Sequence, residues 1–270
     1  MFKTNKAILK FKNVSFGYKP KQLVLSNISF SIFENEHIAI IGSNASGKST
    51  LGKVIAGLFK PLSGSIYFKG EQISKENVTK LKQSIGIVFE NPDSQFIGIT
   101  VQDDIAFGLE NQMVPHAEMQ KIINTCAKYT GIFDLLKFSP FNLSGGQKQL
   151  AAITSVIAMK PEIIVFDEVT NMLDNKSKQQ INSLINLLKN KHHKTIISIT
   201  HDMDEALRAD RIIVMNKGKI VLIDTPSKVF SKNIEYFLLD KPFTFKLSKE
   251  LGLKPTTNLN KLVEEIIHEK

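Results

Sequence analysis

The sequence predicts an α/β fold with a mixed sheet at its core, and three observations lead to that prediction. Apolar runs at residues 38–41, 163–166 and 195–199 are typical of fully buried strands in a largely parallel sheet. The first part of the chain alternates apolar and polar residues, as the strands of a half-buried antiparallel sheet do. Residues 91–158 change to a helical pattern, which predicts a helical subdomain inserted between the strands.

The other expected strands follow from the same two patterns. Alternating or continuous apolar residues predict strands at residues 8–16, 23–33, 64–69 and 85–89. The first three would form an antiparallel β subdomain. Residues 212–223 consist of two apolar runs separated by Asn216-Lys217-Gly218, which predicts a hairpin. This hairpin would close a main domain of residues 1–225.

The composition changes after residue 225, where three prolines divide a small C-terminal extension of residues 226–270: Pro226, Pro242 and Pro255. The last segment places five apolar residues on one helical face: Leu259, Leu262, Val263, Ile266 and Ile267. Such a stripe is typical of core packing. A partner helix, with the extension acting in dimerisation, is the alternative that stays open.

Length and cysteine content bound the class of protein. The 270 residues suffice for one large domain with a small appendage. No apolar run approaches the roughly 20 residues that a membrane span needs, and the N-terminus lacks the apolar segment of a secretory signal. One cysteine cannot form an internal disulfide, so a reducing, cytoplasmic location is expected.

The net charge of +9 is compatible with nucleic-acid binding, with an anionic membrane surface or with coding bias. Arginine occurs only at Arg208 and Arg211, and the lysines are scattered rather than gathered into one arm. Abundant Lys, Asn and Ile without any Trp are typical of an AT-rich genome. Coding bias is therefore the better interpretation, and no specific nucleic-acid partner is expected.

A glycine-rich loop follows the buried strand at residues 38–41 and fits the pattern G-x-x-x-x-G-K-[ST]. It consists of Gly42-Ser43-Asn44-Ala45-Ser46-Gly47-Lys48-Ser49-Thr50. The two glycines permit backbone angles closed to other residues, so that successive amides can point at phosphate oxygens. Lys48 would add a cation for the β- and γ-phosphates, and the Ser49 hydroxyl is placed to ligate Mg²⁺. The loop predicts a nucleotide-phosphate site.

Polar residues that follow two other buried strands suit phosphoryl transfer. Asp167 would hold Mg²⁺, Glu168 would polarise the attacking water, and His201 would contact the γ-phosphate. A histidine in such a place is otherwise typical of a satisfied core residue. A second motif, Leu143-Ser144-Gly145-Gly146-Gln147, is on its own more typical of a flexible turn.

These motifs in this order resemble the nucleotide-binding subunits of ABC transporters, over residues 5–225. The resemblance implies a P-loop NTPase fold of ABC type that binds ATP with Mg²⁺. It implies that Tyr18 stacks on adenine, with packing of this ring as the alternative. It implies that residues 144–147 complete the ATP site of a second subunit. The other motifs resemble the Walker B strand, the D-loop and the switch histidine: residues 163–168, residues 171–174 and His201.

A narrower resemblance concerns the ATPase subunits of energy-coupling factor transporters. It rests on Asn91-Pro92-Asp93-Ser94-Gln95-Phe96, and on residues 103–108 and 200–206, which are more similar to the first of two paralogous subunits. It implies an importer for vitamins or metal ions, driven by a heterodimer of paralogous ATPases at the cytoplasmic face of the cell membrane. A transmembrane scaffold subunit, contacted by residues 91–96, and exchangeable substrate-capturing membrane proteins would complete the transporter.

Three residues depart from the pattern of this family. Glu90 stands where a glutamine ligates Mg²⁺, and a carboxylate can do the same. Leu150 replaces an arginine, and Asn171 replaces a D-loop serine. Another ABC importer is the main competing interpretation. A soluble ABC ATPase of DNA or ribosome processes is a further alternative, although such proteins carry a long coiled coil or a second cassette.

Overall fold

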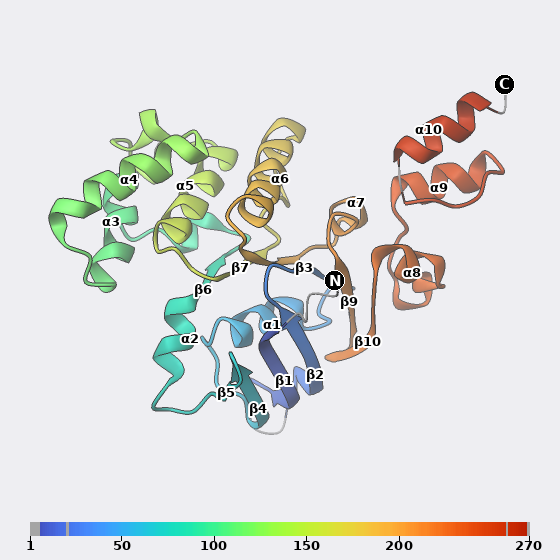
Figure 1. Cartoon of the computed structure of the whole chain (residues 1–270), viewed down its shortest axis with the longest axis horizontal. Coiled ribbons are helices and arrows are strands. Elements are labelled where there is room, and N and C mark those ends of the chain that lie inside the picture. The colour runs from blue at the N-terminus through green and yellow to red at the C-terminus, as the bar shows by residue number, and fades with distance from the viewer. Residues whose placement is uncertain (1–5, 20–21, 258, 269–270) are drawn as a thin grey trace. The chain divides into compact units, whose positions relative to one another are not determined.

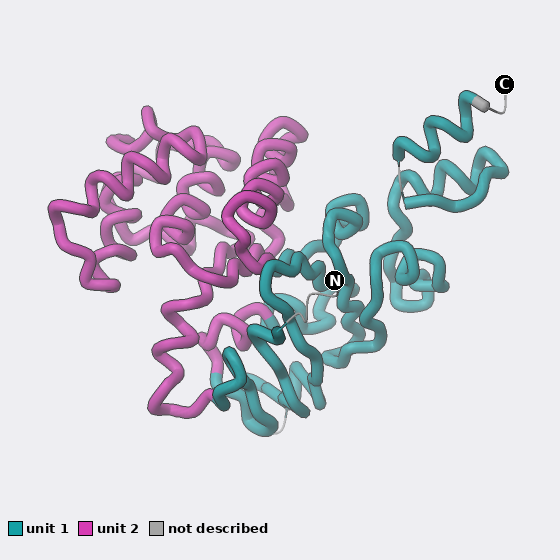
Figure 2. Tube along the Cα trace, viewed as in Figure 1, with its two compact units in different colours: residues 1–51, 60–72, 197–270 teal, residues 52–59, 73–196 magenta. Residues whose placement is uncertain are grey.

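The computed structural model describes residues 6–19, 22–257 and 259–268. The chain forms two compact units that alternate along the sequence (Figure 2). Unit 1 consists of residues 1–51, 60–72 and 197–270, and unit 2 consists of residues 52–59 and 73–196. Figure 1 labels the elements of both units. Among the residues that the structure describes, no helix is both long enough and apolar enough to cross a membrane.

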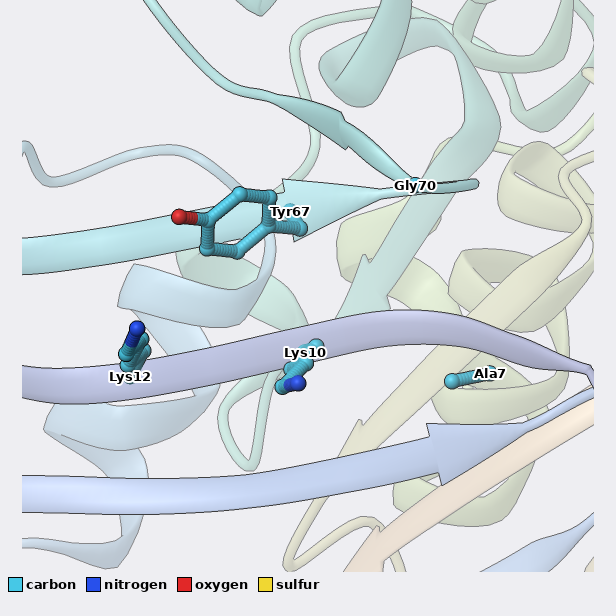
Figure 3. A pocket seen from close by; sticks show the side chains of 5 residues that line it. All are labelled: Ala7, Lys10, Lys12, Tyr67 and Gly70. Atoms are coloured by element: carbon cyan, nitrogen blue, oxygen red, sulfur yellow. The ribbon is translucent and has the colours of Figure 1, made fainter.

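Unit 1 begins with the antiparallel sheet that the alternating residues predict. Its strands lie in the order β2-β1-β4-β5, and their bounds are Leu25–Phe33, Ala7–Phe16, Ser63–Phe68 and Glu71–Gln72. The buried rings of Phe11 in β1 and Phe30 in β2 stack with their centroids 4.8 Å apart. A pocket of about 350 Å³ on this sheet (Figure 3) contains none of the predicted site residues and is lined by Ala7, Lys10, Lys12, Tyr67 and Gly70.

The second sheet of unit 1 is mixed, as predicted. β3 (His37–Gly42) runs parallel to β9 (Arg211–Asn216), and β9 pairs antiparallel with β10 (Lys219–Asp224). Lys217 and Gly218 join β9 to β10 with φ angles of 45° and 73°, the positive values that a two-residue hairpin turn requires. β8 (Thr195–Ile199) begins in unit 2 and ends in unit 1.

Arg211, the first residue of β9, connects the two sheets of unit 1. Its Nε and Nη2 atoms both donate to the carboxylate of Glu36, and Nη2 lies 3.0 Å from Glu36 Oε2. Nη2 also donates to the carbonyl of Ser31 in β2 at 2.7 Å, and the guanidinium carbon lies 5.1 Å from the centre of the Phe33 ring. This arrangement needs a planar group with several fixed donors, which arginine has and lysine lacks.

Short helices complete unit 1. They are α7 (Met203–Ala206), α8 (Pro226–Ser231), α9 (Phe243–Glu250) and α10 (Leu259–His268), with a 3₁₀ turn at Ile234–Phe237. Phe230 and Phe245 share a buried cluster with Ile212 and Val214 of β9. The C-terminal extension is thus attached to the mixed sheet through its aromatic residues.

The apolar stripe predicted at the end of the chain lies on α10, which packs beside α9 (Figure 1). Leu262 is fully buried, whereas Leu259, Val263 and Ile267 remain exposed. The stripe therefore serves core packing through one residue, and a partner helix stays a prediction for the exposed ones.

Unit 2 contains a parallel pair of strands and the helical subdomain. β6 (Ile85–Val88) pairs with β7 (Ile163–Asp167). The helices are α2 (Val78–Ser84), α3 (Val101–Asn111), α4 (His116–Thr130), α5 (Gly145–Ala158) and α6 (Asn175–Asn190), and α1 (Lys48–Ile55) starts in unit 1 and ends in unit 2. Short 3₁₀ turns lie at Pro92–Ser94, Phe133–Leu135 and Pro140–Asn142.

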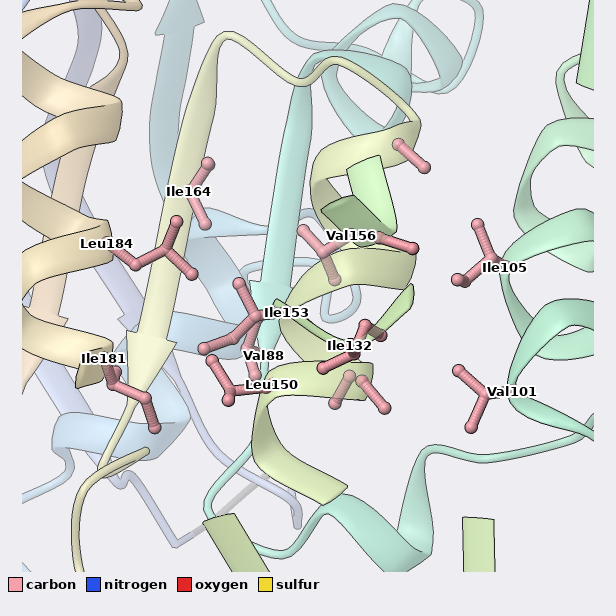
Figure 4. Close-up of a cluster of buried hydrophobic side chains, with 14 of the residues drawn as sticks. Val88, Val101, Ile105, Ile132, Leu150, Ile153, Val156, Ile164, Ile181 and Leu184 are labelled. Atoms are coloured by element: carbon pink, nitrogen blue, oxygen red, sulfur yellow. The ribbon is translucent and has the colours of Figure 1, made fainter. Parts of the chain in front are cut away.

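Helix α5 lies at the centre of the buried cluster of unit 2 (Figure 4). Ile153 and Val156 of α5 pack with Val88 of β6, Ile164 of β7 and Ile105 of α3 within this cluster. Burial on several sides explains why the part of α5 after residue 149 is mostly apolar.

Leu150, on the same helix, is only 5% exposed and belongs to this cluster. A guanidinium at this depth would lose its hydration, so the leucine suits its surroundings in this chain.

Candidate functional site

The predicted site residues are divided between the two units. The Gly42–Thr50 loop, Tyr18 and His201 belong to unit 1. The acidic residues Glu90, Asp167 and Glu168 and the motif of residues 144–147 belong to unit 2. Within each unit, the structure brings several of these residues into direct contact.

The glycine-rich loop leaves the buried strand β3 and enters α1 at Lys48. Lys48 is buried, and its ammonium donates to the carbonyls of Gly42 and Ser43 at 3.0 and 3.2 Å. These two backbone carbonyls hold the ammonium beside the loop. The first residue of α1 therefore adds a full positive charge to the positive end of the helix dipole.

Two positions in the loop leave no room for a side chain. A Cβ atom on Gly42 would lie 2.5 Å from both Ser46 Oγ and the Met215 carbonyl, and Gly47 has a φ of 99°. Ser46 Oγ is buried in the loop without a hydrogen-bond partner among the described residues. A tight turn with an unsatisfied polar atom and a fixed cation fits an anion-binding loop.

Tyr18 lies beside this loop. Its hydroxyl is 3.2 Å from Thr50 Oγ1, and its ring meets Phe16 edge-on with centroids 5.3 Å apart. Because Tyr18 is 60% exposed, it is not a core residue, and the ring offers a face to solvent. Stacking on adenine stays a prediction that this geometry permits.

His201 lies two residues after the end of β8 and precedes α7, whose N-cap is Asp202. The amide of Thr200 donates to the carbonyl of Ile40 at 3.2 Å, which ties this strand end to β3 within unit 1. His201 is exposed, so the alternative of a satisfied core histidine is wrong. The apolar run shows that the strand is buried. It does not show at which residue the chain leaves the core and becomes exposed to solvent.

The acidic pair of unit 2 lies at the end of β7. Asp167 is buried as its last residue, while Glu168 is half-buried and adopts a φ of 52°. The amide of Asn171 donates to the carbonyl of Glu168 at 3.0 Å and closes the turn. Asn171 Nδ2 also lies 2.7 Å from Glu90 Oε1 and 3.5 Å from Glu168 Oε2. The structure thus brings Glu90 and Glu168 to the same side-chain amide.

Residues 144–147 form the start of α5, so the alternative of a flexible turn is wrong. Ser144 is the N-cap and forms a capping box with Gln147, in which Gln147 Oε1 accepts from the Ser144 amide at 3.0 Å. Ser144, Gly145 and Gln147 are exposed. A Cβ atom on Gly146 would lie 2.4 Å from Ser177 Oγ, so α6 also requires a glycine here.

Two glutamines hold the backbone next to Glu90. Gln95 belongs to the segment that the sequence predicts to contact a scaffold subunit, whereas Gln149 lies outside all of the predicted motifs. Gln95 Oε1 accepts from the Phe89 amide at 3.3 Å, and Gln149 Nε2 donates to the Phe89 carbonyl at 3.1 Å. Gln149 is only 1% exposed. The sequence carries no signal for this contact, because Gln147 and Lys148 directly before Gln149 are polar as well.

Asp104 also has a role that the sequence did not reveal. Its carboxylate is buried and accepts from the amides of Ile97 and Gly98 at 2.9 and 3.3 Å and from Ser155 Oγ at 2.7 Å. It therefore fastens the loop before α3 to helix α5.

Asp174, which follows the turn after β7, caps α6. The amide and hydroxyl of Ser177 donate to its carboxylate at 2.9 and 2.8 Å. The amide hydrogen bond, followed by the hydroxyl, lowers the pKa of Asp174 below its ordinary value. The carboxylate stays ionised and supports the start of α6.

A phosphate loop, an acidic pair after a buried strand and a capped glycine motif on an inserted helical subdomain together define an ATPase of the ABC class. The ABC transporter family matches residues 25–171 of this chain. The energy-coupling factor transporter ATP-binding protein EcfA1 of Ureaplasma parvum serovar 3 is 51% identical over 266 residues, which cover 96% of this chain and 90% of that protein. The EcfA1 protein of Mycoplasmoides gallisepticum is 46% identical over 267 residues, with coverage of 96% and 95%.

Two solved structures of related proteins have the same fold as this chain. The cbiO1 protein of Clostridium perfringens, part of the ABC transporter complex cbiONQ, has a TM-score of 0.76 at 36% identity and covers 84% of this chain and 92% of that chain. The ATP-binding cassette MJ0796 bound to ADP and Pi has a TM-score of 0.73 at 29% identity, with coverage of 81% and 98%. The chain belongs to the ABC transporter family and, within it, to the ATP-binding proteins of energy-coupling factor transporters. The fold class and the ATPase activity that the motifs predict are thereby confirmed.

Proposed function

We propose that this chain is the ATP-hydrolysing subunit of an energy-coupling factor importer and works at the cytoplasmic face of the membrane. The observation that carries the proposal is the phosphate loop, in which the buried Lys48 stands at the start of α1 beside two glycines that tolerate no side chain. Relatives named as transporter ATP-binding proteins, and a solved relative from a transporter complex, support it.

Residues 42–50 would bind the β- and γ-phosphates of ATP. The loop amides and the start of α1 supply partial positive charge, and Lys48 supplies a full one. The exposed ring of Tyr18 lies beside the loop, where an apolar face suits the adenine ring.

The described residues contain no group of three or more His, Cys, Asp or Glu side chains that would hold a metal ion by themselves. This suits Mg²⁺, which binds in such sites through one or two carboxylates, water and substrate phosphates. We assign Ser49, Glu90 and Asp167 as its ligands. When bound, Mg²⁺ neutralises charge on the transferred phosphoryl group.

Glu168 and His201 would act on the reacting atoms. Glu168 polarises the attacking water, and the tight turn after β7 holds its backbone at the strand end. His201 contacts the γ-phosphate. Positioning and charge neutralisation then account for most of the catalysis, because phosphoryl transfer needs little covalent help from the protein.

The exposed residues Ser144, Gly145 and Gln147 would complete the ATP site of a second, paralogous ATPase subunit. A transmembrane scaffold subunit would receive residues 91–96, and exchangeable membrane proteins would deliver the transported vitamin or metal ion. The cbiO1 relative, which is part of the ABC transporter complex cbiONQ, supports such an assembly. Purification from detergent-solubilised membranes, with the partners identified by mass, tests it directly, and recovery without any membrane protein would contradict it.

Two substitutions test the ATPase assignment. Lys48→Ala removes the cation of the loop and should abolish measurable ATP binding in calorimetry, whereas Lys60→Ala removes an exposed lysine outside the loop and should not. Glu168→Gln keeps the loop intact, so ATP should bind normally while hydrolysis by the assembled complex falls by roughly 10²–10⁴-fold. Wild-type affinity in Lys48→Ala, or unchanged turnover in Glu168→Gln, would overturn the corresponding role.

A further inference from the structure

Asn171 holds a position between two carboxylates of unit 2. Its side-chain nitrogen lies 2.7 Å from Glu90 Oε1 and 3.5 Å from Glu168 Oε2. Ionised carboxylates only accept hydrogen bonds, so the nitrogen of the amide, and not its oxygen, must face them. An amide nitrogen carries two hydrogens, and one is available for each carboxylate.

The turn after β7 places Asn171 where it can do this. Glu168 has a φ of 52°, a conformation that a non-glycine residue adopts at some cost in free energy. The Asn171 amide closes the turn by donating to the Glu168 carbonyl at 3.0 Å. Backbone and side chain of Asn171 therefore both bind Glu168, and together they fix where its carboxylate points.

The backbone next to Glu90 is held by two hydrogen bonds. The amide and the carbonyl of the preceding Phe89 are bound by Gln95 and by the buried Gln149 of α5. Glu90 is thus held in place relative to α5. The hydrogen bond between Glu90 and Asn171 in turn connects Glu90 to the turn that carries Glu168.

We propose that Asn171 is a positioning residue for ATP hydrolysis, whose side-chain amide bridges Glu90 and Glu168 and sets the direction of the Glu168 carboxylate. This inference rests on the proposed function of Glu168. Asn171 touches neither substrate nor metal in this role, because it acts only through the two glutamates.

The chemistry explains why the residues at positions 90 and 171 suit each other. A serine hydroxyl has one hydrogen and serves one carboxylate at a time, and an aspartate has none when it is ionised. Positions 90 and 168 both carry a carboxylate. Compared with serine and aspartate, asparagine is the residue at position 171 whose neutral amide can donate one hydrogen to each of them. Glu90 and Asn171, two departures from the family pattern, thus form one matched pair.

The test uses the complete transporter purified with its membrane partners, and measures ATPase kcat and KM. Asn171→Ala should lower kcat roughly tenfold, as expected for the loss of a hydrogen bond to a charged group, and leave KM for ATP within about twofold. The double variant Asn171→Ala, Glu90→Ala should lose less in kcat than the product of the two single losses, because both substitutions remove the bond between Asn171 and Glu90. Asn190→Ala, at the exposed end of α6, is the matched control and should retain wild-type kcat.

A second pair of variants separates positioning from simple support of the fold. Asn171→Asp keeps the size of the side chain but removes its donors, so kcat should fall at least as far as in Asn171→Ala. Adding Glu90→Gln restores a hydrogen bond between positions 90 and 171, but the aspartate at position 171 still cannot donate to Glu168, so kcat should stay low at an unchanged thermal midpoint. Multiplicative effects in the double variant, wild-type kcat in Asn171→Ala, or full recovery on adding Glu90→Gln would each overturn the proposal.

The Glu168→Gln variant keeps the two proposals distinguishable. If Glu168→Gln retains wild-type turnover, the proposed function of Glu168 fails. If Glu168→Gln is slow while Asn171→Ala is as fast as wild type, only the role of Asn171 fails.

Discussion

Replacing Asp104 by alanine should release the loop before α3, and the structure gives the size of the effect. Its buried carboxylate accepts three hydrogen bonds, two from the Ile97 and Gly98 amides and one from Ser155. A hydrogen bond to a charged group contributes about 1.5–3 kcal/mol, and the exposed Ile97 can regain water once released. We therefore expect Asp104→Ala to reduce the free energy of local opening by about 2–4 kcal/mol.

Hydrogen exchange measures this free energy at the residues concerned. A loss of about 2 kcal/mol corresponds to roughly 30-fold faster exchange of the Ile97 and Gly98 amides. Asp104→Asn keeps one carboxamide oxygen for these amides and should cost about 1 kcal/mol. Glu110→Ala removes an exposed carboxylate from the same helix and serves as the control. Unchanged exchange at Ile97 in Asp104→Ala would refute the assignment of Asp104 as the anchor of this loop.

Three further predictions concern α4 and α5. Ser144→Arg should reduce the free energy of unfolding by about 1 kcal/mol, because the N-cap of α5 is lost. It should also slow ATP turnover by the assembled complex, and unchanged turnover would contradict a role for Ser144 in the partner's site. Lys148→Met breaks the 2.8 Å ion pair with the half-exposed Asp93 and should change the free energy of urea unfolding by less than about 1 kcal/mol, so a larger loss would show that this pair matters more than surface pairs do. Burial, opposed by the nearby Lys160, raises the pKa of the Cys126 thiol, so iodoacetamide should label it more slowly at neutral pH in the folded chain than in urea, and equal rates would contradict this.

The fold could be predicted from the sequence wherever one pattern continued along a segment. The apolar run at residues 163–166 became β7, Ile163–Asp167, and the runs around Lys217 and Gly218 became β9 and β10. Periodicity reports which residues are buried and does not report their neighbours. The interleaving of two compact units along the chain was therefore not visible in the sequence.

The site was predictable to the extent that its residues form contiguous motifs. The loop around Lys48 and the capped start of α5 lie where the sequence placed them. The contacts that hold the acidic residues were not predictable, because Gln149 and Phe89, or Asn171 and Glu90, are far apart in sequence. A single polar residue has many potential partners, and only the packing of α5 and of the turn after β7 selects one.

Arg211 is one of only two arginines in a chain whose Lys and Arg residues number 35. A lysine suffices wherever only a positive charge is required. At Arg211 a lysine would keep the charge but could not bind both oxygens of Glu36 and the Ser31 carbonyl with one rigid group. The junction of the two sheets of unit 1 therefore depends on the shape of this side chain, whereas the positive charge of the chain as a whole does not.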